Sequence, residues 1–403
     1  MKLGYKFRFQ FLSFTALIFV LWAQKQFGWL YLNTKGGFGD LLYVLEKSSC
    51  LDQEVVDLYS VRTQNPCSGY IYGSTLIKVI NLFQINQAHL EIVGSLLIVL
   101  FCLIFINAVA PINNSYSPTV FFLLLFFSPP IILLLERANI DLLILLLVHA
   151  SGFLISKGKT FAGILVLLLA GTFKFYPLLV AVFMVLLVKG RKKLLLLMLC
   201  FLCSIVVIRD ISKLPFLPWD ARNMFGNIIW GEYLAYVLRG EYSHAGYFSS
   251  SFLGVLILFI VFLFAKKIYS KKITLTRVKS VSSQSHLYYY VLYAGTYITC
   301  YFSGLNVDYR LVFMLMAGIY FTKLYLINLA GKIIFSCLLL LSCVFSYNVE
   351  LLQPIGDTAQ LFVVLTYLNV FFLLFKSKIQ SFLNKLLITR NTIFASISRK
   401  PQK

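Results

Sequence analysis

Long apolar stretches follow one another along the chain, separated by short polar or basic segments. A helix needs about 20 mainly apolar residues to cross the ~30 Å hydrocarbon core of a bilayer. The pattern therefore predicts an all-α polytopic membrane protein with about ten full spans. These spans are expected near residues 9–31, 90–110, 118–135, 139–156, 194–209, 250–265, 287–303, 311–329, 332–347 and 358–375.

One further apolar stretch, 161–188, has a polar interruption at its centre. Lys174 and Pro177 lie between two apolar arms, and basic residues flank the stretch on both sides. Lys and Arg concentrate in the cytoplasmic loops of membrane proteins, so both ends of this stretch are expected in the cytoplasm. The stretch is predicted to be a hairpin of two short helices, with Lys174 at its outer tip.

The basic residues also predict the orientation of the other spans. Lys2, Lys6 and Arg8 indicate a cytoplasmic amino terminus. Alternation from there puts the loops 33–89 and 210–249 outside, and it puts all 15 Asp and Glu residues on the same outer side. The polar chemistry of the protein is therefore expected on its outer face.

Composition excludes several classes of protein. Of the 403 residues, 60% are hydrophobic and 13% are charged, whereas a soluble domain carries about 25% charged residues. A soluble enzyme and a nucleic-acid-binding protein are both excluded, because the net charge of +21 is accounted for by basic cytoplasmic segments. The histidines lack zinc-ligand spacing, and no phosphate-binding Gly-rich loop is present.

The chain is predicted to form one transmembrane domain, residues 1–378, followed by a basic amphipathic tail, 379–403, on the cytoplasmic leaflet. No small-residue cleavage site follows the first apolar run, which is expected to remain as an anchor. In the first outer loop, segment 74–84 is apolar but too short to span, so it is expected in the interface. Cys50 and Cys67 are expected to form a disulfide, with two free thiols as the alternative.

Polar residues gather at four places on the predicted outer side. These are Asp40 and the segments 136–141, 174–177 and 306–310. Charged groups at membrane depth are costly and usually mark a functional site. The alternative is a purely structural role, in which ion pairs such as Arg137 with Asp141 hold helices together. A second pair of this kind would be Asp308 with Arg310.

These segments resemble the signature of glycosyltransferase family 87, a branch of the GT-C superfamily of polytopic transferases that use polyprenyl-phosphate sugars. Ala138 stands where the family more often has Gly, and YIYG replaces the usual Tyr-Pro-Pro. The resemblance covers roughly residues 30–310 and is carried by 136–141 (ERANID), 174–177 (KFYP), 40–43 (DLLY), 70–73 (YIYG) and 308–310 (DYR).

The resemblance implies a GT-C-like fold and an inverting transfer of one sugar, a hexose or mannose-like unit, to a lipid-linked or cell-envelope glycan on the outer face. In such a transfer a carboxylate accepts the proton of the attacking hydroxyl, and cations stabilise the departing phosphate. The resemblance assigns the base to Asp40, with Asp57 as the alternate. It assigns the donor phosphate to Arg137, Lys174 and Arg310.

The resemblance further implies that a second group of residues shapes the sugar and acceptor site: Asn139, Asp141, Tyr176, Asp308, Trp219 and Asp220. An interfacial aromatic belt explains the aromatic residues of loop 210–249 equally well. No metal and no other cofactor is expected, because Arg and Lys can neutralise a monophosphate leaving group. The abundance of Lys, Ile and Phe, with few Ala, favours a bacterial inner membrane.

Two other functions stay open. A surface-polysaccharide polymerase would also work on the outer face, but it would be expected to rely on Arg-rich outer loops. A transporter or flippase for a lipid-linked glycan would be expected to show internal repeats and broken helices at mid-membrane. The Lys174 break is the only such feature in the sequence, and no second half of the chain mirrors it.

Overall fold

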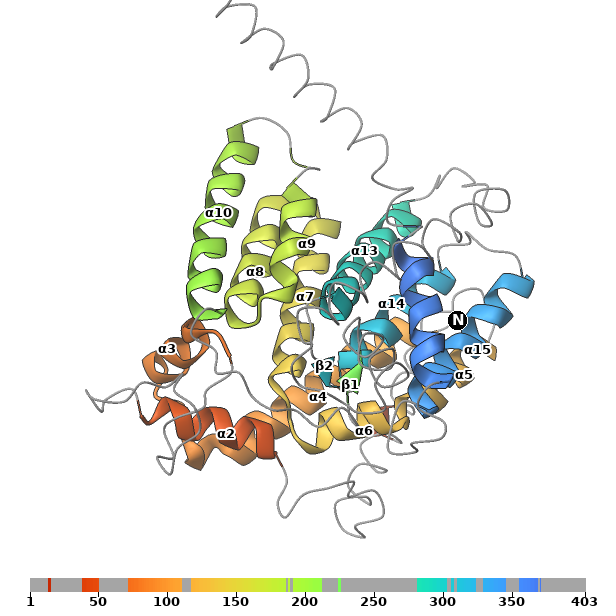
Figure 1. The fold of residues 1–403 in the computed structure, drawn as a ribbon, viewed down its shortest axis with the longest axis horizontal. Coiled ribbons are helices and arrows are strands. Elements are labelled where there is room, and N and C mark those ends of the chain that lie inside the picture. The colour runs from red at the N-terminus through yellow and green to blue at the C-terminus, as the bar shows by residue number, and fades with distance from the viewer. Residues whose placement is uncertain are drawn as a thin grey trace, which may run out of the picture.

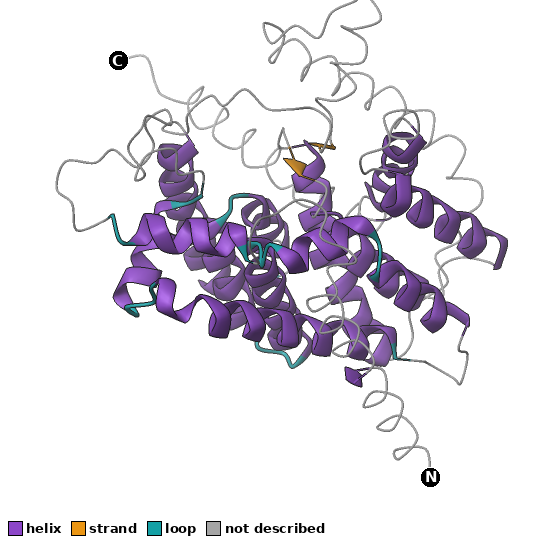
Figure 2. Ribbon diagram, turned by 90° about the horizontal axis from the view of Figure 1, so that it is seen from below, coloured by secondary structure: helices purple, strands orange, loops and turns teal. Residues whose placement is uncertain are grey.

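Helices make up nearly all of the described structure (Figure 2), as the all-α prediction requires. The computed structural model describes residues 14–15, 38–50, 72–110, 117–185, 188, 191–211, 224–225, 281–302, 306–307, 310–323, 329–345, 355–368 and 370. Two short strands, β1 (Met224–Phe225) and β2 (Asn306–Val307), pair antiparallel.

Length and composition suit a membrane span in one helical segment of the described residues, Gln87–Val109. Several other apolar helices have 10–17 residues. The structure therefore agrees with the predicted helical class, but it does not by itself give the number of spans.

Four helices run side by side in one half of the bundle (Figure 1). They are α7 (Ile140–Ser156), α8 (Thr160–Phe173), α9 (Tyr176–Val185) and α10 (Arg191–Ile211). The predicted hairpin at 161–188 is confirmed, because α8 and α9 pack against each other on either side of Lys174. Lys174 has an extended backbone, and Pro177 occupies the first turn of α9, where its missing amide is not needed.

The other half of the bundle contains helices that come later in the chain. α13 (Val281–Phe302) packs against α7 and α9, and α14 (Leu311–Lys323) packs against α13. α15 (Leu329–Phe345) contacts α14, and a last described helix covers Ile355–Leu368. The hydroxyl of Tyr367 donates to the carbonyl of Met314 at 2.8 Å, which ties this last helix to α14.

Two short helices of the predicted first outer loop lie across the lower ends of the upright helices in Figure 1. They are α2 (Gly39–Ser48) and α3 (Ser74–Leu82). α3 packs against α8, and α2 packs against α4 (Leu90–Val109), which the short helix η1 (Gln87–His89) precedes. Segment 74–84, expected in the interface because it is too short to span, is largely α3.

The stretch 118–135, predicted as one span, is not one continuous helix. The chain forms two helices there, α5 (Ser117–Phe126) and α6 (Pro129–Glu136). Ser128 is extended, with φ −68° and ψ 149°, and two prolines open α6. A residue before proline is driven out of the helical conformation, so the apolar run cannot continue as one helix.

Several predicted features lie outside the described residues. These include most of the span 9–31, all of the span 250–265, most of loop 210–249 and the tail 379–403. Cys50 is disulfide-bonded, as predicted, while its expected partner Cys67 lies outside the described part of the chain. Six other cysteines have free thiols, and five of them are buried or partly buried among apolar side chains.

A cluster of phenylalanines joins α4 to α5. Phe126 is fully buried, and its ring centroid lies 5.8 Å from that of Phe101 and 4.9 Å from that of Phe105. Aromatic rings bury large apolar areas, so this cluster contributes strongly to the packing of α5.

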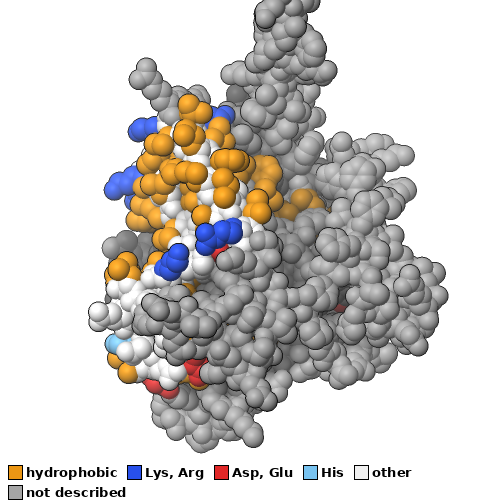
Figure 3. All heavy atoms as spheres, turned by 60° about the vertical axis from the view of Figure 1, so that its left-hand side comes forward, with side chains coloured by type: hydrophobic (Ala, Val, Ile, Leu, Met, Phe, Trp, Pro, Cys, Tyr) orange, Lys and Arg blue, Asp and Glu red, His pale blue; other side chains and the backbone are white. Residues whose placement is uncertain are grey.

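α10 presents an apolar surface to its surroundings. Its exposed apolar side chains extend along most of the helix: Leu194, Leu195, Leu197, Met198, Phe201, Leu202, Ile205, Val206 and Ile208. Figure 3 shows that apolar side chains cover much of this face, with Lys and Arg above and below them. A soluble monomer rarely exposes a continuous apolar patch of this kind.

Phe126→Ala is expected to lower the free energy of unfolding by about 3–5 kcal/mol, because it leaves a cavity between Phe101 and Phe105. Leu124→Ala on the same helix is the matched control, because Leu124 is 66% exposed and should cost much less. Thermal or denaturant unfolding of the purified variants measures the difference. Equal losses for the two variants would contradict the placement of α5.

Candidate functional site

The first carboxylate of the site, Asp40, lies in the first turn of α2. The amides of Phe38 and Asp40 donate to the carbonyls of Glu136 and Arg137, at 2.8 and 3.2 Å. These bonds attach the start of α2 to the end of α6. The position of Asp40 is therefore set by backbone contacts with the segment that carries the other site residues.

Arg137 pairs with Asp40. Its Nε donates to Oδ1 of Asp40 at 2.8 Å, and its Nη2 donates to the same oxygen. The side chain of Arg137 is 35% exposed, whereas that of Asp40 is 11% exposed. This pair therefore forms the accessible end of the site.

Asn139 joins the two carboxylates of the site. It is the N-cap of α7, and its Oδ1 accepts from the amide of Asp141 at 2.8 Å. Its Nδ2 donates to Oδ2 of Asp40, and its Oδ1 also accepts from Nζ of Lys174 at 3.5 Å. An amide suits this place because it donates to one carboxylate while capping the helix that carries the other.

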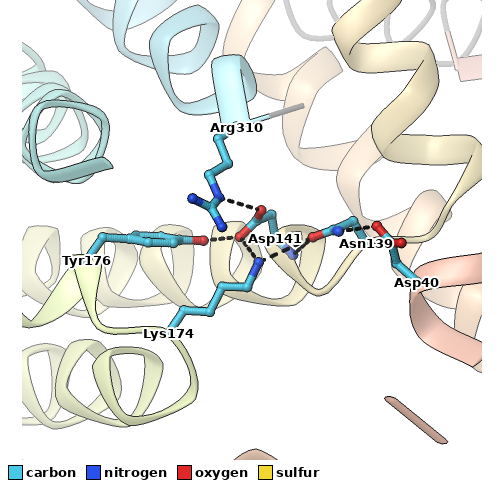
Figure 4. Close-up of polar contacts among 6 residues, drawn as sticks. All are labelled: Asp40, Asn139, Asp141, Lys174, Tyr176 and Arg310. Atoms are coloured by element: carbon cyan, nitrogen blue, oxygen red, sulfur yellow. Dashed lines mark hydrogen bonds and ion pairs between the residues drawn. The ribbon is translucent and has the colours of Figure 1, made fainter. Parts of the chain in front are cut away.

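Asp141 is fully buried and forms ion pairs with two cations (Figure 4). Nζ of Lys174 donates to Oδ1 at 2.8 Å, and Nε of Arg310 lies 3.4 Å from Oδ2. The Tyr176 hydroxyl also donates to Oδ1. A buried carboxylate is tolerated only when it is paired and hydrogen-bonded, and Asp141 meets both conditions.

The two cations of Asp141 are themselves packed against aromatic rings. Nζ of Lys174 lies 4.7 Å from the ring centroid of Tyr72, and the Arg310 guanidinium lies 5.6 Å from that of Tyr176. The Tyr176 ring packs in turn on Phe313 of α14, at 5.6 Å. Cations over aromatic faces gain electrostatic stabilisation that offsets part of their desolvation.

Ala138 has an unusual backbone conformation between the two partners of Asp40. Its φ is +42°, a left-handed conformation that glycine adopts without steric cost. The turn between α6 and α7 therefore needs this backbone shape to bring Arg137 and Asn139 to opposite sides of Asp40.

The structure brings together most of the predicted site residues that it describes: Asp40, Arg137, Asn139, Asp141, Lys174, Tyr176 and Arg310. The suggested pair of Arg137 with Asp141 is wrong, because Arg137 pairs with Asp40. Arg310 pairs with Asp141, while Asp308 lies outside the described residues. Asp57, Trp219 and Asp220 also lie outside them and stay predictions.

Two residues at the site received no role from sequence reasoning. Tyr72 lies against Lys174, and Asp210 of α10 binds the start of α3. The resemblance included Tyr72 in the YIYG segment, but it did not predict the contact of Tyr72 with Lys174. The described residues contain no cluster of three or more His, Cys, Asp or Glu side chains that could hold a metal, and the metal-free expectation stays a prediction.

Asp141→Asn is expected to destabilise the fold by about 3–5 kcal/mol, because it leaves the buried charges of Lys174 and Arg310 uncompensated. Asp40→Asn should cost only about 1 kcal/mol, because its partner Arg137 remains partly solvated. Denaturant unfolding of the two variants tests this order. A larger loss of stability for Asp40→Asn would contradict the division of the site into a buried group around Asp141 and an accessible pair of Asp40 with Arg137.

Comparison with known proteins leaves the resemblance as an expectation. No protein-family model, no curated protein and no solved structure matches this chain. The likeness to glycosyltransferase family 87 therefore depends on the short sequence motifs alone.

Proposed function

We propose that the protein is a membrane glycosyltransferase that moves one sugar, a hexose or mannose-like unit, from a polyprenyl-phosphate donor to a lipid-linked or cell-envelope glycan. One observation carries this proposal: Asp40, the carboxylate at the accessible end of the site, is linked through Asn139 to Lys174, which shares Asp141 with Arg310. A base beside phosphate-binding cations is the set of groups that this transfer requires.

The charge of the site supports a monoanionic donor. Arg137, Lys174 and Arg310 face two carboxylates, Asp40 and Asp141, which leaves an excess of one positive charge among the described site residues. A polyprenyl-phosphate sugar is a phosphodiester and carries one negative charge. Its binding would neutralise the site without an additional cation.

The reaction proposed here is a direct displacement at the anomeric carbon. The acceptor hydroxyl attacks this carbon and gives its proton to Asp40, whose Oδ2 can accept a further hydrogen bond besides that from Asn139. The bond between the anomeric carbon and the phosphate oxygen breaks, and its electron pair leaves with polyprenyl phosphate. Arg137 is the accessible cation, and Lys174 and Arg310 add positive potential from a deeper position.

Asp141 and Tyr176 have a supporting role in this scheme. Both oxygens of Asp141 are engaged by Lys174, Tyr176 and Arg310. Asp141 thus fixes the positions of two cations that come from different elements of the chain. The proposed contacts of Asp308, Trp219 and Asp220 with the sugar or acceptor remain part of this proposal.

We infer that the chain is an integral protein of a bacterial inner membrane, with about ten spans, both termini cytoplasmic and the site on the outer face. Two observations support this topology. Residues that the charge pattern assigns to the outer side, among them Asp40, Lys174 and Arg310, meet at one site. The exposed apolar face of α10 would be covered by lipid.

Asp40→Asn is expected to lower sugar transfer by about 10²–10⁴-fold, because the attacking hydroxyl loses its base. The assay uses purified protein, radiolabelled polyprenyl-phosphate sugars and a membrane glycolipid extract as acceptor. Glu46→Gln is the control, because Glu46 is an exposed acid of the same helix. Asp57→Asn tests the alternate base, and a greater loss there than in Asp40→Asn would transfer the role of base to Asp57.

Lys174→Met should lower transfer by about 10²–10³-fold, in line with the loss of one group that stabilises developing charge. If no donor reacts, while wild-type protein moves intact lipid-linked glycan across liposomes, the enzyme proposal fails. The charged site would then belong to a transport path.

The topology predicts opposite labelling of two exposed positions. Ala88, before α4, should face the outside, and Lys157, between α7 and α8, should face the cytoplasm. In intact cells a membrane-impermeant maleimide should react with Ala88→Cys and not with Lys157→Cys, relative to the parent chain. Lysed cells should label both variants, and equal labelling in intact cells would contradict the proposed orientation.

A further inference from the structure

The segment that leads into α3 lies directly against the tip of the α8–α9 hairpin. The amide of Gly73 donates to the carbonyl of Phe173 at 3.1 Å. A Cβ at position 73 would lie 2.0 Å from the carbonyl oxygen of Thr172. Gly73 has φ −64° and ψ 140°, a conformation that every residue type adopts. Glycine is therefore required for the close approach of two backbones, and not for its conformational freedom.

A carboxylate from α10 holds the other side of this segment. Oδ2 of Asp210 accepts from the amide of Ser74 at 2.7 Å, across 136 positions of the sequence. The N-cap residue of α3 is Gly73, which has no side chain with which to cap the helix. Asp210 supplies the missing acceptor and places a negative charge at the positive end of α3. The segment is thus held between the hairpin and α10.

Tyr72, next to this anchored glycine, lies against the ammonium group of Lys174. Nζ of Lys174 is 4.7 Å from the ring centroid, and both side chains are buried. A lysine side chain is long and flexible, and it loses rotamer freedom when it is held in one place. The Tyr72 ring and Asp141 both contact the ammonium group, and together they restrict it to the site.

We propose that Tyr72 and Gly73 are positioning residues for Lys174. Gly73 brings the segment close enough to the hairpin tip, Asp210 fixes the start of α3, and the Tyr72 ring holds the ammonium beside Asp141. The ring acts through Lys174 and touches no reacting atom. The catalytic consequence of this arrangement rests on the proposed transferase function, whereas the arrangement itself does not.

The arrangement is tested by the chemical reactivity of Lys174. A small amine-acylating reagent is applied at fixed pH, and mass spectrometry follows modification of this lysine. Tyr72→Leu and Gly73→Ala are expected to raise the rate of modification about tenfold, because loss of the ring contact exposes the amine to the reagent and removes an interaction that favours its protonated, unreactive form. Tyr72→Phe keeps the ring and should stay within about twofold of wild type.

Tyr43→Leu provides a matched control. The ring centroid of Tyr43 lies 5.0 Å from Nζ of Lys47 on α2, which is a second contact between a tyrosine ring and a lysine. This variant should change the modification of Lys47 and leave that of Lys174 unchanged. Melting temperatures of all variants show whether the fold is kept, and the Tyr72 pair decides the outcome if Gly73→Ala fails to fold. Wild-type reactivity of Lys174 in a folded Tyr72→Leu variant would overturn the proposal.

Sugar-transfer kinetics test the catalytic consequence separately. Tyr72→Leu should lower kcat/KM about tenfold, and Tyr72→Phe should restore it to near the wild-type value. Faster acylation of Lys174 together with wild-type transfer by Tyr72→Leu would overturn the positioning role in catalysis. If acylation changes as expected but wild-type protein transfers no sugar, the transferase proposal fails and the arrangement around Lys174 stands.

Discussion

A carboxylate that is wholly removed from water has to be neutralised within the protein, and Asp141 imposes this constraint on the bundle. Its side chain is fully buried, so the free-energy cost of its charge must be offset by Lys174 and Arg310. These cations come from the tip of the α8–α9 hairpin and from the start of α14. Because both cations pair with Asp141, the compensation of this one buried charge connects the two halves of the bundle.

The constraint also separates the site into two parts with different properties. Asp141 is enclosed, and its oxygens are engaged by three side chains. Asp40 is held by Arg137, whose side chain remains in contact with solvent. Asn139 connects the two parts and keeps the carboxylates from facing each other directly. Two carboxylates from distant parts of the sequence, one enclosed and one at the accessible end, therefore lie in the same site.

Sequence reasoning succeeded where the signal was local. The interruption of an apolar run by Lys174 and Pro177, together with the basic residues on both flanks of the run, predicted the α8–α9 hairpin. The same local reasoning failed at residues 118–135. There the high hydrophobicity concealed the effect of Pro129 and Pro130, which divide the run into α5 and α6.

Pairings between distant residues could not be predicted in the same way. The sequence identified Arg137, Asp141 and Arg310 as charged groups with a common side, but it contained no information on which carboxylate each cation would reach. The contact of Asp210 with the start of α3 spans 136 positions and has no motif. Such contacts depend on the packing of several helices at once, and only the folded chain defines them.

The order in which the partners of Asp141 emerge during synthesis follows from their positions. Lys174 comes 33 residues after Asp141, and Arg310 comes 169 residues after it. At about 5–20 residues per second, the first partner is made within roughly 2–7 s and the second only after roughly 10–30 s. Between these two events 136 residues are added, and during that interval Lys174 is the one of the two cations that has been made. The hairpin directly after α7 neutralises the carboxylate early, and Arg310 completes the site when α14 is made.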